Sequence, residues 1–380
     1  MEIQSRLPDV GTSIFAVMSG MANEYGAINL SQGFPDFNID PKIIELVHQH
    51  MMSGSNQYAP MPGLPMLRNI IGDVIFNTYQ HRVNPETDIT VTAGATQAIF
   101  AIVSAFINPG DEVIVFDPAY DSYNPAIRLN GGVPVHINLN YPDFSIDWDF
   151  VRTKISSRTK MIMINTPHNP CGTVLREHDL KSLEKIALEF NLLVLSDEVY
   201  ERLIFDQLEH QSALRFPALS AQTLAVFSFG KTFHATGWKV GYVVAPHYLT
   251  RELRKVHQFM VFSVNTPLQH AFAEYMKNPD HYLPLGKFYQ RKRDFFLEQI
   301  KGSSFVPLPC RGSYFQLLSY KDISTKTDLA MAEELTKKFK IASIPISAFY
   351  QDKSDHQVLR FCFAKKEETL ETAGEILRKI

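Results

Sequence analysis

One lysine in this sequence stands where its amine could react. Lys231 follows the apolar run 224–227 and the pair Ser228 and Gly230, and a second cation, Lys239, lies eight residues further on. A lysine at the rim of a buried sheet loses solvation, which lowers its pKa and makes its amine a nucleophile toward carbonyl groups. Ser228 and Lys239 could hold an anionic group beside that amine. An aldehyde cofactor that carries a phosphate would use all three residues.

The same residues allow two plainer interpretations. The run Gly230–Lys231–Thr232 resembles the end of a phosphate-binding P-loop, but that motif also requires a glycine where this chain has Ala225. A lysine after a strand, taken alone, usually lies on the surface. The other strand ends must therefore decide between a reactive and a surface lysine.

Size and composition exclude several classes of protein. A chain of 380 residues can form two lobes, and a formal charge of −3 without a basic cluster argues against nucleic acid as a partner. No apolar run reaches the roughly 20 residues of a membrane span, and residues 1–6 lack a secretion signal, so we expect a cytoplasmic protein. The 3 cysteines and 13 histidines show no metal-ligand spacing, so no metal is predicted.

The elements that must position these residues form an alternation of strands and helices. Helices are expected at 43–52 and 64–79, and the first forty residues show no clear periodic element. Strands are expected at 88–92, 112–116, 133–138, 160–165, 192–195, 224–227 and 241–245, the last possible as an antiparallel strand. Helices at 97–107, 177–190, 251–260, 267–276 and 289–300 accompany them, and strands at 313–318 and 358–363 with a helix at 328–339 indicate a small α+β lobe.

Five of these strands end in polar, sharply turned segments. In a largely parallel sheet the carboxyl ends of the strands share one edge, and ligands bind in the crevice there. We therefore expect the five segments to meet in one site, which is hard to explain as five chance turns. They are Gly94–Ala95–Thr96, Tyr120, Asn169, Asp197 with Tyr200, and Ser228 with Lys231.

Pyridoxal phosphate would use these residues together. It needs a lysine for its aldehyde, a partner for its ring nitrogen, phosphate donors and a flat surface against its ring. Lys231 could form the imine, and Asp197, costly to bury without a cation, could hold the ring nitrogen protonated. The phosphate donors would be Gly94, Ala95 and Thr96 at a helix N-terminus, together with Ser228 and Lys239. Tyr120 would stack on the cofactor ring. The phenolic oxygen of the cofactor would be bound by Asn169 and Tyr200. Taken singly, Asp197 could be a helix N-cap, and Tyr120 and Tyr200 could be core residues.

Three motifs resemble those of the class I/II aminotransferases of fold type I, which use pyridoxal phosphate. They are Asn169-Pro170-x-Gly172, the run 196–200 (SDEVY) and the run 228–233 (SFGKTF). The run 29–37 (NLSQGFPDF) resembles the branch of kynurenine/glutamine and methionine aminotransferases, and the match extends from about residue 10 to the C-terminus. The resemblance implies an α/β fold with a mostly parallel central sheet flanked by helices. The large cofactor-binding domain would span 45–285, and the small α+β domain would combine 1–44 and 286–380.

The resemblance also implies roles for individual residues. Lys231 would be the Schiff-base lysine, and Asp197 and Tyr200 would complete the catalytic set. The planar fork of Arg360 would clamp the α-carboxylate of the substrate, assisted by Gly33 and Asn169, and Phe15 would line the side-chain pocket. Tyr58 would reach the phosphate in a neighbouring subunit, which implies a homodimer. Two departures stand out, because most relatives have arginine at position 239 and many have serine at position 230.

The implied activity transfers the amino group of an amino acid to a 2-oxo acid, through a Lys231–pyridoxal phosphate Schiff base and a ping-pong pyridoxamine intermediate. A methionine-like, aromatic, glutamine or kynurenine substrate is favoured over aspartate, although a cation such as Arg128 near the pocket would change this. A cysteine-S-conjugate or cystathionine β-lyase of the same fold would use the same lysine. A sensor module of a transcription regulator would need a DNA-binding domain, for which we see no room before residue 10. A nicotinamide enzyme would need a Gly-x-Gly-x-x-Gly turn after the first strand, and none is present.

Overall fold

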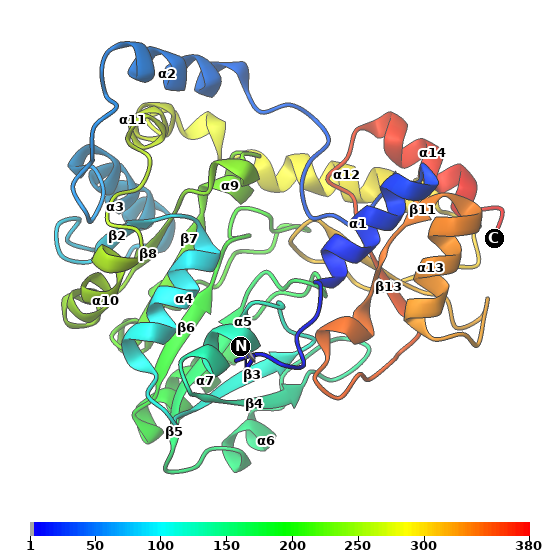
Figure 1. The fold of residues 1–380 in the computed structure, drawn as a ribbon, viewed down its shortest axis with the longest axis horizontal. Helices are drawn as coiled ribbons and strands as arrows, with labels where there is room; N and C mark the ends of the chain where they lie inside the picture. The colour runs from blue at the N-terminus through cyan, green and yellow to red at the C-terminus, as the bar shows by residue number, and fades with distance from the viewer. Residues whose placement is uncertain (1–3) are drawn as a thin grey trace.

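The computed structural model describes residues 4–380. The first three residues, which belong to the predicted segment 1–44 and to the start for which no secretion signal is expected, lie outside the described residues. A seven-stranded sheet forms the centre of the larger part of the molecule (Figure 1). In spatial order its strands are β2 (Ile89–Thr92), β8 (Gly241–Val244), β7 (Thr223–Ser228), β6 (Leu193–Asp197), β5 (Thr159–Asn165), β3 (Glu112–Asp117) and β4 (Val133–Asn138).

The direction of the strands confirms a mostly parallel sheet. Only β8 runs antiparallel to its neighbours β2 and β7, which is the orientation considered for 241–245. The other six strands share one direction. The carboxyl ends of β2, β3, β5, β6 and β7 consequently lie at the same edge. The crevice expected at that edge can therefore form.

Both faces of this sheet are covered by helices, which explains why its central strands are apolar throughout. In β3, Val113 and Val115 face one core while Ile114 and Phe116 face the other. The first core includes α4 (Ala95–Phe106), α5 (Tyr123–Leu129) and α10 (His247–Met260). The second includes α2 (Pro41–Met52), α3 (Pro65–Tyr79), α6 (Trp148–Thr153), α7 (Glu177–Phe190), α8 (Pro217–Ser220), α9 (Phe229–Thr232) and α11 (Thr266–Tyr275).

A smaller part is built around a four-stranded antiparallel sheet. Its strands, in order, are β12 (Ile344–Pro345), β13 (Val358–Cys362), β10 (Phe315–Ser319) and β9 (Val306–Pro307). Its helices are α12 (Leu285–Gln299), α13 (Asp328–Phe339) and α14 (Glu367–Leu377). The N-terminal segment joins this part, because β1 (Ile28–Asn29) pairs with β11 (Ile341–Ala342) and α1 (Ile14–Tyr25) packs beside α13 (Figure 1).

The predicted domain limits fall inside helices. The limit between 44 and 45 lies within α2, which packs along α11 of the larger part, and the limit between 285 and 286 lies in the first turn of α12. The chain reaches the larger part before α2 begins. The division into a large domain of 45–285 and a small domain of 1–44 with 286–380 remains a prediction. The limits of these domains would have to move to the ends of the two helices.

Helix α1 contradicts the expectation that the first forty residues lack a periodic element. Its end signals are present: the Ser13 hydroxyl accepts a hydrogen bond from the amide of Ala16 at 3.3 Å, and Gly26 ends the helix with φ of 59°. Only Met18 and Ala22 of the helix are buried, so its apolar stripe is too narrow to stand out as a period. Helices α5, α6 and α14 were not predicted either.

Within the described chain, neither a membrane-spanning helix nor a metal-binding cluster is present. No helix within residues 4–380 is both long and apolar enough to cross a membrane. In the same residues, no group of three or more histidine, cysteine, aspartate and glutamate side chains is arranged to hold a metal ion.

Candidate active site

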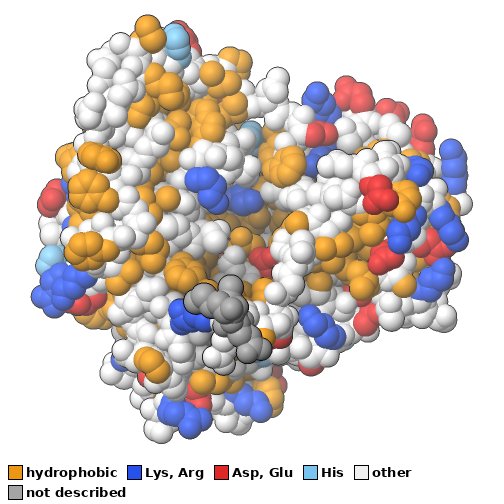
Figure 2. Space-filling view, viewed as in Figure 1, with side chains coloured by type: hydrophobic (Ala, Val, Ile, Leu, Met, Phe, Trp, Pro, Cys, Tyr) orange, Lys and Arg blue, Asp and Glu red, His pale blue; other side chains and the backbone are white. Residues whose placement is uncertain are grey.

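A single pocket collects almost all of the predicted site residues. It lies at the carboxyl ends of β2, β5, β6 and β7, and residues of the N-terminal segment and of the four-stranded sheet close its other side. In the space-filling view the surface is hollowed between the two parts of the molecule, with basic side chains at the hollow (Figure 2). The predicted residues that line the pocket are Phe15, Gly33, Gly94, Ala95, Thr96, Tyr120, Asn169, Asp197, Tyr200, Ser228, Lys231, Lys239 and Arg360.

Lys231 lies in the short helix α9, directly after β7. Its side chain reaches the pocket but is otherwise enclosed, and this burial lowers the pKa of its amine to about 8. The amine donates hydrogen bonds to the hydroxyl of Tyr314 at 2.8 Å and to the carbonyl oxygen of Gly33 at 3.2 Å. At a pKa near 8, about one fifth of the amine is neutral at about pH 7.4, and this fraction is able to act as a nucleophile or base.

Asp197 ends β6 with its carboxylate 4% exposed. Burial raises its pKa to about 6, against the opposing effects of hydrogen bonds from the hydroxyl of Tyr123 (2.6 Å) and the amide of Val199 (3.4 Å). Among residues 4–380, no cationic side chain lies within ion-pair distance of this carboxylate. A buried carboxylate that faces a pocket without a cation fits a ligand that brings positive charge with it.

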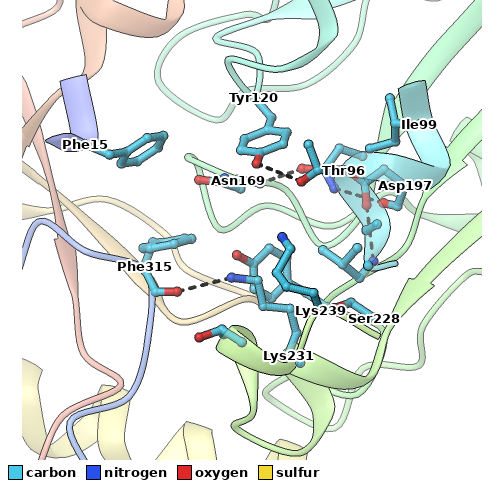
Figure 3. Close-up of a pocket in the computed structure, with 18 of the residues that line it drawn as sticks. Phe15, Thr96, Ile99, Tyr120, Asn169, Asp197, Ser228, Lys231, Lys239 and Phe315 are labelled. Carbon is cyan, nitrogen blue, oxygen red and sulfur yellow. Dashed lines mark hydrogen bonds between the residues drawn. The ribbon is translucent and has the colours of Figure 1, made fainter. Parts of the chain in front are cut away.

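The N-terminus of α4 forms an anion seat. Gly94 caps the helix with φ of 78°, so the first amides of Ala95 and Thr96 have no partner within the helix. Ser228 and Lys239 lie close to this end, and a Cβ atom added to Gly94 would lie 3.5 Å from Cε of Lys239 (Figure 3). The Thr96 hydroxyl lies 3.4 Å from that of Tyr120, whose ring faces the pocket. Helix amides, a hydroxyl and a cation together suit a phosphate group.

Arg360 lies in β13 and is fully buried at the opposite end of the pocket. Its guanidinium donates to Oδ1 of Asn169 at 2.8 Å and to the carbonyl oxygen of Ser31 at 2.7 Å, and the Phe315 ring lies 3.9 Å from it. Its Nε has no partner among the described residues, and no carboxylate of residues 4–380 pairs with it. Burial lowers its pKa to about 10, so it keeps its charge at neutral pH. A charged guanidinium with free donors suits a carboxylate of the substrate.

Between these two ends the pocket wall is largely apolar or aromatic. Phe15, Ile99, Tyr120 and Phe315 line it, and Gln32 fixes the start of α1 by donating to the carbonyl oxygen of Phe15 at 3.2 Å. Among the described residues that line the pocket, the cationic side chains are Lys231, Lys239 and Arg360. Arg128, considered as a further cation, pairs instead with Asp9 at 2.9 and 2.5 Å outside the pocket.

Tyr58 is the one predicted site residue that does not line the pocket. Its side chain is 81% exposed and meets only the edge of Phe262, whose ring centroid lies 5.3 Å away. Gly33 lines the pocket, and the predicted role of its amide toward the substrate carboxylate stays a prediction. In the structure its carbonyl oxygen faces Lys231, and a Cβ atom at this position would lie 2.8 Å from the Phe315 ring. Only glycine fits this close approach.

Several residues at this site were not predicted, among them Tyr123, Asn165, Tyr314 and Phe315. Asn165 ends β5 and joins its neighbours, because its side chain donates to the Asp197 carbonyl at 2.9 Å and accepts from the Asn169 amide at 2.7 Å. It could have been found, since it is the last residue of a predicted strand. Tyr314 lies within the predicted strand 313–318 and directly precedes β10. Nothing in the sequence distinguishes its buried hydroxyl from that of a core tyrosine.

The arrangement fits pyridoxal phosphate at each of its functional groups. Lys231 would meet the aldehyde, the helix end with Ser228 and Lys239 would hold the phosphate, and Asp197 would meet the ring nitrogen. Arg360, left with unused donors, would meet a second, carboxylate-bearing molecule. Such a site is typical of pyridoxal phosphate enzymes that act on amino acids.

Comparison with known proteins agrees with this class. The family model for aminotransferases of class I and II matches residues 25–377, and the chain belongs to that family. It is 46% identical to a methionine aminotransferase of Escherichia coli over 99% of this chain and 98% of that protein. The solved structure of the methionine aminotransferase from that organism matches with a TM-score of 0.98 over 100% of both chains.

More distant relatives act on other substrates. Human kynurenine–oxoglutarate transaminase 3 is 32% identical over 98% of this chain and 89% of that protein. The structure of N-succinyldiaminopimelate aminotransferase from Mycobacterium tuberculosis is 33% identical and matches with a TM-score of 0.95 over 100% of both chains. The predicted family, fold class and enzyme class are confirmed, and the family implies pyridoxal phosphate with amino acids and 2-oxo acids as substrates. The roles of the individual site residues remain predictions.

Proposed function

We propose that this aminotransferase moves the amino group of a methionine-like amino acid, and of aromatic amino acids, to a 2-oxo acid. The observation that carries the proposal is the 46% identity to a methionine aminotransferase over 99% of the chain. The pocket supports it, because its wall offers Phe15, Ile99 and Phe315 to a side chain and no cation beyond Lys231, Lys239 and Arg360. A substrate with a second carboxylate, such as aspartate, would leave that charge unpaired in the pocket.

Each residue has one task in this proposal. Arg360, held between Asn169 and Ser31, binds the α-carboxylate with its remaining donors and so fixes the α-carbon near Lys231. Pyridoxal phosphate, when bound, supplies the aldehyde and the electron-accepting ring. The neutral amine of Lys231 takes the proton from the α-carbon and later returns a proton on the same side. With the cofactor bound, the carboxylate of Asp197 would keep the ring nitrogen protonated, and Tyr200 and Asn169 would hold the phenolic oxygen.

We further propose a homodimer in which Tyr58 reaches the phosphate of the neighbouring site. Tyr58, Phe259 and Phe262 are exposed by 81%, 88% and 50%, and they lie near the pocket end of α10. Figure 2 shows hydrophobic side chains gathered over the part of the surface that carries α2, α10 and α11. An exposed apolar surface of this kind is typical of an interface between subunits.

Mixed dimers test the shared site. Lys231→Ala removes the lysine, and Tyr58→Ala removes the phosphate contact that we assign to the other subunit. When the two variants are mixed and exchanged, one site per mixed dimer regains both residues, and the activity should return above that of either variant alone. Activity that never returns, in a sample shown by ultracentrifugation to contain mixed dimers, would contradict the proposal.

A panel of amino acids with a 2-oxo-acid acceptor tests the substrate class. Methionine and phenylalanine should be converted to 2-oxo acids with a kcat/KM at least about tenfold above that of aspartate. The same panel includes cystathionine without any acceptor. Pyruvate and ammonia released from it would identify the alternative, a β-lyase of the same fold.

The variant Lys231→Ala tests the central assignment. It should lose turnover and the covalent attachment of the cofactor, which reduction with borohydride and mass spectrometry detect at Lys231 in the unchanged protein. The matched control is Lys255→Ala on the exposed face of α10, where the amine pairs only with Glu252. A Lys231→Ala protein that still turns over would remove Lys231 from the mechanism.

A further inference from the structure

The hydroxyl of Tyr314 binds Lys231 from the side opposite the pocket. Tyr314 is 1% exposed and does not line the pocket, whereas the Lys231 amine does. The two atoms are 2.8 Å apart, although Lys231 lies in α9 of the larger part and Tyr314 directly precedes β10 of the smaller part. Gly33, in the N-terminal segment, supplies the second acceptor at 3.2 Å. The lysine of the larger part is therefore held by two groups that belong to the smaller part.

The direction of these hydrogen bonds follows from the number of protons. Burial raises the pKa of the Tyr314 hydroxyl well above its ordinary value, so it stays protonated and has one proton to donate. That proton goes to the carbonyl oxygen of Gly33. The hydroxyl of Tyr200 is a further hydrogen-bonding neighbour of Tyr314, and a lone pair of the Tyr314 oxygen accepts from Lys231.

Two acceptors determine how a neutral lysine amine is oriented. A neutral amine has two N–H bonds and one lone pair. If Tyr314 and Gly33 each accept one N–H bond, both protons point away from the pocket centre. The lone pair occupies the remaining tetrahedral direction, on the pocket side.

We propose that Tyr314 is a positioning residue that, together with the Gly33 carbonyl, receives the free Lys231 amine and aims its lone pair into the pocket. The inference rests on the proposed role of Lys231 as the reacting lysine. Tyr314 does not touch substrate in this arrangement and acts only through Lys231. Its removal leaves the amine with one fixed N–H bond and freedom to rotate about it.

The other charged and titratable groups around Lys231 stay in place when Tyr314 is changed. Arg360 and Lys239 favour the neutral amine, while Asp197 and Cys362 favour the ammonium form. The rings of Tyr200 and Tyr314 lie 5.5 and 5.4 Å from the amine. A shift in the pKa of Lys231 on loss of the Tyr314 hydroxyl therefore reports the lost acceptor.

The matched pair of variants is Tyr314→Phe and Tyr289→Phe. Tyr289 is also a fully buried tyrosine and its ring lies 5.8 Å from that of Tyr314, but its hydroxyl has no hydrogen-bond partner among the described residues. The first measurement uses cofactor-free protein. Its Lys231 amine is carbamylated with cyanate from about pH 6 to about pH 10, and peptide mass spectrometry gives the rate at Lys231.

The loss of an acceptor for the ammonium form should lower the Lys231 pKa by about one unit in Tyr314→Phe and leave it unchanged in Tyr289→Phe. In the holoenzyme, kcat should fall about tenfold, with KM and the cofactor Kd within about twofold of the unchanged enzyme. An unchanged pKa in Tyr314→Phe, or an equal shift in both variants, would overturn the proposal. Because the pKa is read without cofactor or substrate, it tests the contact even if the proposed substrate class is wrong.

A second measurement covers the case in which Tyr314→Phe does not fold. 3-Fluorotyrosine at position 314 keeps the ring and the hydroxyl but makes the oxygen a weaker acceptor. It should lower the Lys231 pKa in the same direction by a smaller amount. No shift in a folded, fluorinated protein would also overturn the proposal.

Discussion

The hydroxyl of Tyr123 donates a 2.6 Å hydrogen bond to Oδ2 of Asp197 beneath the pocket. Both side chains are buried, and Tyr123 begins α5 while Asp197 ends β6, so the bond joins a helix to the sheet that it covers. Burial raises the pKa of Asp197, and hydrogen bonds from Tyr123 and Val199 lower it, so that the pKa is about 6. Asp197 is therefore ionised at neutral pH, but by a small margin.

The variant Tyr123→Phe should bring the pKa of Asp197 closer to neutral pH. Loss of a donor to a charged group raises the pKa of Asp197 by about one unit, which weakens its hold on a protonated ring nitrogen. We expect the Kd of pyridoxal phosphate, measured by equilibrium dialysis at neutral pH, to rise about tenfold. The control is Tyr350→Phe, which removes a buried hydroxyl without a partner in the described chain. Equal affinity in both variants would show that Tyr123 only fills space.

The variant Arg360→Lys should separate substrate binding from cofactor binding. Lysine keeps the positive charge but loses the planar fork, so the α-carboxylate is bound by one point contact instead of two parallel bonds. We expect KM for methionine to rise about 10- to 100-fold in steady-state kinetics, with little change in the cofactor Kd. Arg128→Lys, where the arginine pairs with Asp9 outside the pocket, is the matched control. An unchanged KM would show that Arg360 does not bind the carboxylate.

The sequence predicts the strand ends well and the contacts between distant segments poorly. Asp197 and Lys231 each follow an apolar run and precede a turn, which is a local signal, and a parallel sheet brings such ends together without further information. The bond between Tyr314 and Lys231 spans 83 positions of sequence, and no local pattern reports it. A tyrosine in an apolar segment is a core residue by default, so a functional hydroxyl stays hidden until the fold places it.

The helices also show that a local sequence pattern does not report contacts between distant segments. Helix α7 was predicted with both ends correct because its apolar residues repeat on one face. Helix α1 was missed because it lies on the surface of the smaller part and buries only two side chains, yet it carries Phe15 into the pocket. The spacing of apolar residues along the chain indicates how much of a helix is buried. It does not indicate what the exposed residues of that helix contact.

Lys239 offers a test of the departure from the family pattern. Its backbone has φ of 54°, and its side chain lies beside Gly94 at the anion seat. Lys239→Arg adds a fork of donors without changing the charge, so we expect the cofactor Kd to fall about threefold. Lys340→Arg is a matched control, because Lys340 also has a positive φ of 61° but ends α13 away from the pocket. A Kd that rises in Lys239→Arg would show that the pocket is shaped for lysine.

The pH dependence of stability should show the cost of burying Asp197. Its pKa is about 6 in the fold against 3.8 for an ordinary aspartate, so the unfolded state ionises first as pH rises. In cofactor-free protein below about pH 4, Asp197 is protonated in both the folded and the unfolded state and costs no stability. As the pH rises to about 6 the free energy of unfolding falls, and above that pH the loss is on the order of 3 kcal/mol. Asparagine at this position avoids that cost because it carries no charge.

Asp197→Asn should consequently be more stable than the unchanged protein in cofactor-free form at about pH 8, and nearly equal to it at about pH 4, in thermal or urea unfolding. Asp40→Asn is a control of opposite sign. Tyr275 and the amide of Lys42 lower the pKa of Asp40, so its contribution is present above the unfolded pKa and is lost as pH falls, and its removal should destabilise the protein at about pH 8. Pyridoxal phosphate should reverse the order for Asp197→Asn, because only the carboxylate can pair with a protonated ring nitrogen. An Asp197→Asn protein less stable than the unchanged one at about pH 8 without cofactor would mean that Asp197 already has its positive partner within the chain.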